Sequence, residues 1–583
     1  MVAMHVLSAA EMQACDRATT ERFGVPSILL MRAAAAAVAA FARRQFPEVR
    51  RATVLCGRGN NGGDGMMAAR LLAEAGVEAT TLLLGAPEEL QGDAAEAWRE
   101  LINPLHGRVH IVAAPADLAR HKNALETDLI VDAVLGTGFK PPLKGLALAA
   151  LEWIKDSGAP VLAVDLPSGW PADETSATLS LPVFPADAVV TFTAPKPAHV
   201  FGQLTRRWDQ PIVVAPIGSP EAAIESTLGM DWAGSALSLA QTPRAFAANK
   251  GNFGHVLVVG GTFGAAGGKA GAPAMAALAA LRSGAGLVTA AVPSPALPVV
   301  ASFAAELMTW PLEATPSGAV SSRGLAPARL KALLDGKTVL AIGPGLGQSS
   351  ETAKLVTGLL EKTQIPVVVD ADALNILAGK AALLAKLSKN GKRTMVLTPH
   401  PGEMARLAGM TVARVQAGRL ETARSFARRT GTTLVLKGAR TVIAHPGGRA
   451  AVNTSGNPGM AKGGSGDLLT GLIAGLLAQY PAEPQRAVEA AVALHGLTAD
   501  LAVSVGDERT LLATDCLAYL AQAFRLQLEE LPIGGENGYV WLQGHCMQQT
   551  KSACSERKAQ AADQKRVQGT DSASSGRTKR ATD

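Results

Sequence analysis

The sequence predicts an α/β protein with two doubly wound domains, each built around a parallel sheet. The chain has 583 residues, which exceeds what a single hydrophobic core usually supports. Short apolar runs of strand length alternate with helical stretches in two separate parts of the chain. Its 60 glycines and 34 prolines suit many short loops between strands and helices.

The first domain is expected over residues 1–220. An alanine-rich stretch, 33–42, predicts a helix, and the apolar run 52–56 predicts a strand. A glycine-rich turn and a second helix, 66–76, follow this strand, so the domain begins as a β-loop-α unit. Further buried strands are predicted over 129–134, 161–164, 188–192 and 212–215.

A connector over 221–245 separates this domain from a second one, expected over 246–530. The connector lacks strong periodicity and carries Gly, Ser, Thr and Pro. The second domain again alternates strands and helices, with strands predicted over 255–259, 287–292, 338–342, 366–369, 395–397 and 433–436. The remaining tail, 531–583, is basic, and we expect it to be disordered.

Charge and cysteine content exclude several classes of protein. The formal net charge is +6, but residues 551–583 hold eight Lys and Arg against four Asp and Glu, a net +4, which leaves little for the folded part. We therefore expect no nucleic-acid partner. The five cysteines form no CxxC pair, which indicates a reducing cytoplasm rather than disulfides or zinc. The amino terminus lacks a secretory pattern, and prolines interrupt the apolar run 283–305, so no membrane segment is expected.

The segment LCGRGNNGGDG, Leu55 to Gly65, follows a predicted strand and opens a predicted helix. Backbone N–H groups at such a helix start can bind a phosphate or diphosphate. A tight turn that needs glycine for its conformation alone is the alternative.

Two further loops, VDAVLGTGF and VDLPSGW, each follow a predicted strand and begin with an acid. Parallel sheets bind ligands at the carboxyl ends of their strands. Asn61, Asp132 and Ser168 could supply hard oxygen ligands to a cation, while Asp165 could contact a sugar or move a proton. Taken singly, each acid could instead cap its following turn.

In this order, NNGGDG, DAVLGTG and DLPSG resemble the epimerase domain of the NAD(P)H-hydrate repair family, which implies a Rossmann-like fold. The resemblance implies a potassium site at Asn61, Asp132 and Ser168, and a possible but unassigned role for Lys196 in APKP. Asp165 is the expected catalytic acid or base. The residues implied to bind the hydrated nucleotide are Asn60, Asn61, Gly62, Gly63, Asp64, Gly136, Thr137, Gly138, Phe139, Lys140, Pro141, Pro142 and Asp165. The chain departs from the family at MRAAA, Met31 to Ala35, and at ADETSA, which puts one family contact in doubt.

A second glycine-rich loop, NTSGNPGMAKGGSGDLLTG, runs from Asn453 to Gly471 and precedes an apolar run typical of a buried helix. Gly464 to Gly466 could form an anion hole, and Asp467 could act as a base on a bound hydroxyl. For Asp467 taken alone, a helix N-cap is an adequate explanation.

GGSGD resembles the GAGD signature of ribokinase-like kinases, in which the Asp activates the attacking hydroxyl. Six further segments agree with a narrower family: VVGGTFGAAGG, ALRSGAGLV, IGPGLG, VVDADALN, LTPHPGEM and LKGART. Together they resemble the ADP-dependent (S)-NAD(P)H-hydrate dehydratases from Lys250 to about Ala523. The resemblance implies ADP or AMP contacts from Lys437, Gly438, Ala439, Arg440, Thr441 and Gly466. It implies contacts to the hydrated nucleotide from Gly268, Gly345, His400 and Asp467.

For two of these segments, other interpretations stay open. Without PHPGE, His400 would be a loop histidine bonded to a backbone carbonyl. Asp370 and Asp372 of VVDADALN are expected to form turns or lie near the nucleotide rather than to bind a metal pair. Magnesium is expected to accompany the nucleotide phosphates.

The leading hypothesis is a bifunctional repair enzyme. It would epimerise the R and S forms of NADHX and NADPHX, and dehydrate the S form with ADP as phosphoryl donor. A homo-oligomer is expected. A ribokinase-like small-molecule kinase fused to a nucleotide-binding domain is the first alternative, and a non-catalytic nucleotide-binding scaffold is the second.

Overall fold

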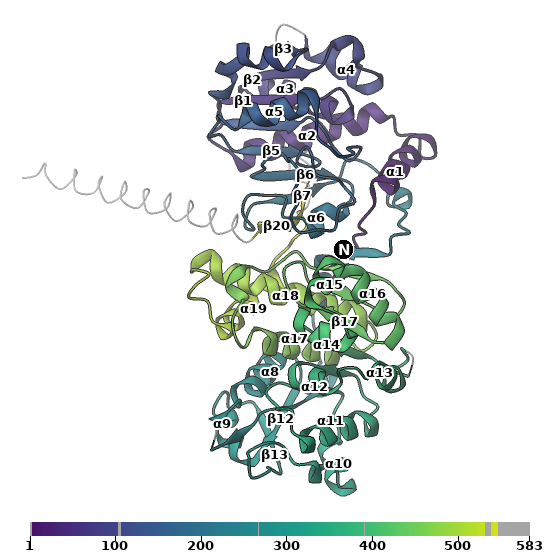
Figure 1. Ribbon diagram of the computed structural model, residues 1–583, viewed down its shortest axis with the longest axis vertical. Coiled ribbons are helices and arrows are strands. Elements are labelled where there is room, and N and C mark those ends of the chain that lie inside the picture. Colours follow the sequence, from purple (N-terminus) through teal and green to yellow (C-terminus); the bar gives the residue numbers. More distant parts are fainter. Residues whose placement is uncertain (1–2, 103–106, 266, 390, 531–537, 546–583) are drawn as a thin grey trace, which may run out of the picture.

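The computed structural model describes residues 3–102, 107–265, 267–389, 391–530 and 538–545. Two α/β units lie one above the other along the long axis of the molecule (Figure 1). Each unit is built on its own sheet, and most neighbouring strands in both sheets are parallel. The predicted fold class is confirmed.

The first sheet has eight strands in the order β20-β7-β6-β5-β4-β1-β2-β3, and only β20 runs antiparallel to its neighbour. The strands of this sheet are β1 Arg51–Cys56, β2 Glu78–Leu84, β3 Arg108–Val112, β4 Leu129–Ala133, β5 Val161–Val164, β6 Ala188–Phe192, β7 Ile212–Ala215 and β20 Val540–Gln543. The helices of this unit are α1 Ala9–Glu21, α2 Ser27–Gln45, α3 Asn60–Glu74, α4 Gly92–Leu101, α5 Gly145–Ile154 and α6 Pro197–Phe201.

Helices cover both faces of the first sheet. Val54 and Cys56 of β1 belong to a core shared with α2, α3 and α4. Leu55, between them, belongs to a separate core shared with α5. Successive side chains of a strand point to opposite faces, so a strand covered on both faces must be apolar throughout. That is why β1 reads as a continuous apolar run.

The second sheet has ten strands in the order β13-β12-β9-β14-β15-β16-β17-β18-β19-β8. These are β8 Met230–Trp232, β9 His255–Val259, β12 Leu287–Pro293, β13 Met308–Leu312, β14 Val339–Ile342, β15 Val367–Val369, β16 Met395–Leu397, β17 Thr433–Leu436, β18 Val442–Ala444 and β19 Ala450–Val452. Two short strands, β10 Phe263–Gly264 and β11 Gly267–Gly268, form a separate hairpin.

The helices of the second unit are α7 Leu237–Ala240, α8 Gly271–Arg282, α9 Leu297–Ala301, α10 Pro327–Leu334, α11 Ser350–Lys362, α12 Ala371–Ile376, α13 Ala381–Leu387, α14 Pro401–Ala408, α15 Val412–Ala417, α16 Arg419–Thr430, α17 Ser465–Gln479, α18 Pro484–Val505 and α19 Leu520–Arg525. Helix α17 packs against α8, α18 and the strands β14 and β15. The glycine-rich loop before α17 therefore leads directly into a buried helix, which fixes the position of its end.

Two segments outside the two expected domains contribute strands to the sheets. The connector 221–245 contains β8, which pairs with β19 and completes the second sheet. The tail 531–583 contains β20, which pairs with β7 in the first sheet. Each strand carries a tryptophan that is almost fully buried, Trp232 and Trp541, so burial of a large ring anchors both segments. Residues 531–537 and 546–583 of the tail expected to be disordered lie outside the described residues.

Helix α18 is long and apolar enough to cross a membrane by composition alone. However, 78% of its most apolar window is buried inside the protein, where it packs on α17. The apolar run 283–305, which raised the same question from the sequence, forms β12 and α9. Among the described residues, Cys15, Cys56 and Cys516 are buried free thiols.

Candidate active sites

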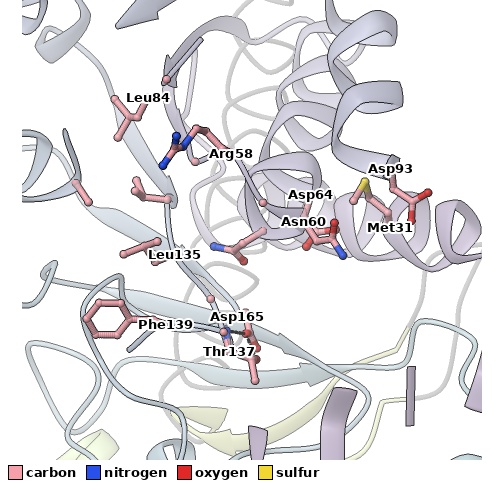
Figure 2. A pocket seen from close by; sticks show the side chains of 18 of the residues that line it. Met31, Arg58, Asn60, Asp64, Leu84, Asp93, Leu135, Thr137, Phe139 and Asp165 are labelled. Atoms are coloured by element: carbon pink, nitrogen blue, oxygen red, sulfur yellow. Dashed lines mark hydrogen bonds between the residues drawn. The ribbon is translucent and has the colours of Figure 1, made fainter. Parts of the chain in front are cut away.

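A cavity of about 1300 Å³ opens at the carboxyl ends of β1, β4 and β5 in the first unit (Figure 2). Many of the residues expected to bind nucleotide line it: Asn60, Asn61, Asp64, Gly136, Thr137, Gly138, Phe139, Lys140, Pro142 and Asp165. Figure 2 shows Asp165 and Thr137 together at one side of the cavity and Asn60 and Asp64 at the start of α3. The structure therefore brings the three predicted loops, which begin near Leu55, Val131 and Val164, into one site.

The first of these loops is the first turn of α3 rather than a turn before it, because the helix begins at Asn60. Gly62 lies against the preceding strand end, and a Cβ at this position would lie 1.9 Å from the carbonyl oxygen of Gly57. Only glycine allows the helix to start so close to the strand. The free N–H groups of this turn face the cavity end of the helix and suit an anion.

Asp165 follows β5 with a left-handed backbone, φ 64°, which is uncommon for a residue other than glycine. Its buried carboxylate accepts hydrogen bonds from Lys196 Nζ at 2.9 Å, Thr191 Oγ1 at 2.8 Å and the Thr137 N–H at 2.8 Å, and also from the Thr137 hydroxyl. Burial alone would raise the pKa of Asp165, but the Lys196 ammonium and these bonds hold it below its usual range. Asp165 is therefore ionised at neutral pH.

Four other carboxyl groups line the same cavity: Asp16 from α1, Asp64 from α3, Asp93 from α4, and Glu89. Burial raises the pKa of Asp64 well above its usual range, and the nearby charges of Asp165 and Asp16 raise it further. Burial also raises the pKa of Asp16. The cavity thus holds an ionised carboxylate, Asp165, beside two carboxyl groups whose pKa is raised by burial. The sequence offered no signal for Asp16, because α1 carries no motif and reaches the site only through the fold.

Lys196, whose role the sequence left unassigned, is buried at the cavity wall with 2% of its side chain exposed. Its ammonium contacts Asp165, Thr191 and the carbonyl oxygen of Phe192. His199 supports this arrangement, since its Nε2 lies 2.7 Å from the Asp165 carbonyl oxygen and its Nδ1 accepts from the Lys196 N–H. Burial lowers the pKa of His199 to about 4, so the ring is neutral.

Asp132 and Ser168 lie together at the ends of β4 and β5. The Ser168 hydroxyl donates to Asp132 Oδ1 at 2.6 Å, and the Ser168 N–H donates to Asp132 Oδ2 at 2.8 Å. Burial raises the pKa of Asp132 to about 6, and none of the described cationic side chains pairs with it. Asn61, the third expected ligand, has a buried side-chain nitrogen without a hydrogen-bond partner. The buried carboxylate of Asp132, which no described cation neutralises, and the Ser168 hydroxyl oxygen are of the kind that binds a monovalent cation, whereas the unpartnered Asn61 nitrogen is a donor.

The departure MRAAA also lies at this cavity. Met31 and Ala34 of α2 line it, and the Met31 side chain packs on Gly63. This segment therefore gives the cavity an apolar surface. Gly63 and Gly62 do not line the cavity themselves but let α3 pack closely on its neighbours.

In the second unit, Asp467 lies in the first turn of α17, and the N-cap position is occupied by Gly464 with φ 93°. The N-cap interpretation of Asp467 is therefore wrong. Its carboxylate has no hydrogen-bond partner among the described side chains and backbone groups, so it is available to a ligand. Burial raises the pKa of Asp467 to about 7, with a further rise from Asp370, against the opposing effects of Lys437 and Lys269.

Asp370 ties several parts of this second site together. Its carboxylate accepts from Lys437 Nζ at 2.9 Å, from the Thr398 hydroxyl at 2.7 Å and from the Thr470 hydroxyl at 2.8 Å. Lys437 follows β17, Thr398 follows β16, and Thr470 lies in α17, one turn beyond Asp467. Sequence reasoning placed Asp370 only near the nucleotide and missed this network, because its members are 28 to 100 residues apart.

The other expected contacts of this site lie on neighbouring loops. The backbone of Lys269, next to Gly268 on the β10–β11 hairpin, packs against Gly345 in the loop after β14. Asp372 accepts from the Gly347 N–H at 2.8 Å in that loop. His400 is the N-cap of α14, and its Nδ1 accepts from the Gly402 N–H. His400 thus bonds backbone N–H groups rather than a carbonyl, which differs from the alternative interpretation.

The loop Lys437 to Thr441 connects β17 to β18. Lys437 Nζ lies 3.3 Å from the position a Cβ would take at Gly466, so this loop and the start of α17 are adjacent. The Arg440 side chain, however, turns toward the first unit and donates to the Gly202 carbonyl oxygen and Gln543 Oε1. Only the backbone of Arg440 is left to face the site.

Two α/β units, each with a helix N-terminus and acids at the carboxyl ends of parallel strands, define a two-domain enzyme that acts on nucleotides. Comparison with known protein families narrows this class of enzyme. Residues 256–521 match the NAD(P)H-hydrate dehydratase family, and residues 27–198 match the family described as YjeF-related protein N-terminus.

Curated relatives match along most of the chain. The bifunctional NAD(P)H-hydrate repair enzyme Nnr of Moorella thermoacetica is 42% identical over 542 residues, which cover 91% of this chain and 98% of the relative. The enzyme of the same name from Coxiella burnetii is 38% identical, covering 84% and 93%. The ADP/ATP-dependent NAD(P)H-hydrate dehydratase of Bacillus subtilis, solved with ATP and Mg²⁺, is 32% identical with a TM-score of 0.41, covering 50% and 96%. The chain belongs to the family of bifunctional NAD(P)H-hydrate repair enzymes.

Proposed function

We propose that this enzyme returns both epimers of hydrated NADH and NADPH to the reduced cofactors. The first domain, residues 1–220, interconverts the R and S hydrates. The second, residues 246–530, dehydrates the S hydrate and uses ADP, with AMP and phosphate as products. The observation that carries the proposal is Asp467, an unpaired carboxylate with a raised pKa in the first turn of a glycine-capped helix.

The chemistry of dehydration explains this arrangement. Hydroxide is a poor leaving group, so the hydroxyl of the hydrate is first phosphorylated. Asp467 takes the proton of the hydrate hydroxyl while the hydroxyl oxygen attacks the terminal phosphorus of ADP, and AMP departs. The backbone N–H groups at Gly464 to Gly466 face the phosphoryl group. Loss of phosphate from one ring carbon and of a proton from its neighbour then restores the dihydropyridine.

For the epimerase, the proposal rests on the contrast between carboxyl groups in one cavity. Asp165 is ionised and held by Lys196, whereas burial and the neighbouring carboxylates raise the pKa of Asp64 well above its usual range. A site that holds a proton acceptor beside proton donors can move protons at a bound hydrate without free hydroxide or hydronium. The first turn of α3 and the loop Gly136 to Pro142 would hold the nucleotide itself.

Two cations belong to the proposal. Magnesium would be held mainly by the phosphates of ADP, since no group of three or more His, Cys, Asp or Glu side chains among the described residues is placed to hold a metal. Potassium would bind Asn61, Asp132 and Ser168 and neutralise the buried carboxylate. We place the enzyme in the cytoplasm, as a homo-oligomer.

Potassium dependence gives a direct measurement. Replacing potassium with tetramethylammonium, which is too large for the Asp132 and Ser168 site, should slow epimerisation several-fold. Asp132→Asn removes the uncompensated charge and should make the remaining epimerase activity indifferent to the cation. An equal response of the wild type and Asp132→Asn to potassium would place the cation elsewhere.

A small-molecule kinase remains the second candidate, because the loop before α17 also suits simple phosphoryl transfer. The full-length protein is incubated with (S)-NADPH hydrate and ADP while the absorbance of the reduced nicotinamide is followed. The proposal expects recovery of NADPH with release of AMP and phosphate. A stable phosphorylated product, or no recovery with either ADP or ATP, would refute dehydration.

The pH dependence of dehydration should show a limb near pH 7. Asp467 acts as a base only when deprotonated, so turnover is expected above its pKa of about 7 and should be lost as the pH falls through it. Asp370→Asn removes a negative charge that raises this pKa, and frees the Lys437 ammonium that lowers it. The limb should then move to lower pH by about one unit. The titratable groups around Asp467 and Lys437 are Asp370, Lys269, Glu403 and His495.

Thr398→Val serves as the matched control for Asp370→Asn. It removes a neutral partner of the same carboxylate and leaves the charges of the site intact. Its pH limb should stay in place even if its turnover falls. A limb that does not move in Asp370→Asn would show that Asp467 is not the group that titrates.

A further inference from the structure

The carboxyl-terminal segment, residues 526–530 and 538–545, crosses from the second domain to the first. We call it the strap. Strand β20 lies at the edge of the upper sheet beside β7, although the preceding helix α19 belongs to the lower unit (Figure 1). The strap lies beyond residue 521, where the match to the dehydratase family ends.

The strap is attached firmly to the first domain. The Tyr539 hydroxyl donates to the Ala37 carbonyl oxygen at 2.8 Å, and its ring packs edge-on against Phe41. Glu530 accepts two hydrogen bonds from Arg44 of α2, at 2.6 and 2.7 Å. Trp541 is buried against Phe41 and its Nε1 donates to Glu530. These contacts fix β20 relative to α2 and β7.

From this strand, Gln543 reaches the second domain. Its Oε1 accepts from Arg440 Nη2 at 2.6 Å, while its Nε2 donates to Thr205 Oγ1 at 3.1 Å and to the Gln210 carbonyl oxygen at 2.8 Å. Both ends of the amide are thus used, one toward each domain. Arg440 donates further to the carbonyl oxygens of Thr454 and Gly202.

Arg440 lies in the loop Lys437 to Thr441 with a left-handed backbone, φ 55°. Such a conformation is unfavourable for a residue other than glycine and persists only where surrounding contacts enforce it. Arg419 supports the loop from inside, with Nη2 near the carbonyl oxygens of Leu436 and Arg440 at 3.1 and 3.4 Å. The side chain of Arg440 is held from outside by Gln543.

We infer that Gln543 is a positioning residue of the dehydratase site: through Arg440 it holds the backbone of the loop Lys437 to Thr441 in the shape that receives ADP. The inference rests on the proposed role of that loop in nucleotide binding. A strand on the sheet of the epimerase domain thereby completes the nucleotide site of the other domain. Loss of Gln543 should weaken ADP binding before it affects the chemistry at Asp467.

The test compares three variants of the full-length enzyme. Gln543→Leu removes both hydrogen-bonding ends and should raise the KM for ADP by about threefold to tenfold, with kcat within about twofold of the wild type. Gln543→Glu keeps an acceptor for Arg440 and should restore most of the affinity, although it loses the donor to Thr205 and Gln210. Glu530→Gln weakens the attachment of the strap to Arg44 without touching Arg440, and should leave the KM for ADP unchanged.

Epimerase kinetics serve as an internal control, since Gln543 lies outside the cavity of the first domain. An unchanged KM for ADP in Gln543→Leu, or an equal rise in Glu530→Gln, would overturn the inference. If the wild type shows no dehydration, the proposed function fails first, and calorimetric ADP affinities of the same variants still decide the role of Gln543. Gln543→Met, which matches the length of glutamine, replaces Gln543→Leu if that variant does not fold.

Discussion

Asp467→Asn should reduce the turnover of dehydration by about 10²- to 10⁴-fold, the usual contribution of a positioned general base. Asparagine has nearly the shape of aspartate but cannot accept the hydroxyl proton. Because the Asp467 carboxylate makes no hydrogen bond to the described residues, the substitution removes no bond that stabilises the fold. The melting temperature should therefore stay close to that of the wild type, and the KM for ADP should change little.

The measurement follows absorbance of the reduced nicotinamide with (S)-NADPH hydrate and ADP. Asp335→Asn changes an exposed carboxylate of the same domain and is the matched control. Epimerisation of the R hydrate by Asp467→Asn should proceed at the wild-type rate, because the two sites lie in different domains. Wild-type dehydration in Asp467→Asn would remove this residue from the mechanism.

Asp165→Asn should reduce epimerisation by about 10²-fold or more, since the substitution removes the ionised carboxylate of the cavity. It also leaves the buried Lys196 ammonium without its partner, and breaking a buried ion pair costs about 3 to 5 kcal/mol of unfolding free energy. The loss of epimerisation and the loss of stability should appear together. Urea unfolding of the first domain measures the loss of stability.

An equal mixture of R and S hydrates with excess ADP separates loss of epimerisation from general unfolding. The wild type should convert the whole mixture to NADPH. Asp165→Asn should convert the S half at the normal rate and then slow to the rate of uncatalysed epimerisation. The double variant Asp165→Asn/Lys196→Met removes the unpaired charge and should recover stability without recovering epimerisation. Complete conversion by Asp165→Asn at the wild-type rate would contradict its assignment.

Most buried parallel strands could be predicted from the sequence, because a strand covered on both faces must be apolar throughout. Six of them, including β5 and β17, have the bounds that the apolar runs predicted. Several strands at or near the sheet edges were missed, among them β2, β3, β13, β18 and β19. β3 has an exposed face, and β18 and β19 are only three residues long. A short or half-exposed strand lacks the local pattern that distinguishes it from a loop.

The residues of the candidate sites likewise divide into those that local sequence patterns predict and those that they do not. Residues within one glycine-rich loop, such as Asn60 to Asp64 or Gly464 to Asp467, could be predicted because each loop carries its own spacing of glycines and acids. Asp16 could not be placed, since α1 carries no such spacing. The sequence placed Asp370 only near the nucleotide and did not predict its hydrogen-bond partners, which lie on distant elements. Arg440 was assigned to the nucleotide, yet its side chain faces Gln543 more than 100 residues away.

By itself, the sequence determined the two α/β domains, the family and the loops that carry the chemistry, because these depend on local patterns of apolar residues, glycines and acids. Only the tertiary structure decided which charges meet. The pairing of Asp165 with Lys196, the network of Asp370 and the return of β20 to the first sheet all join distant segments. Their energies depend on burial and distance, which no local pattern of residues encodes.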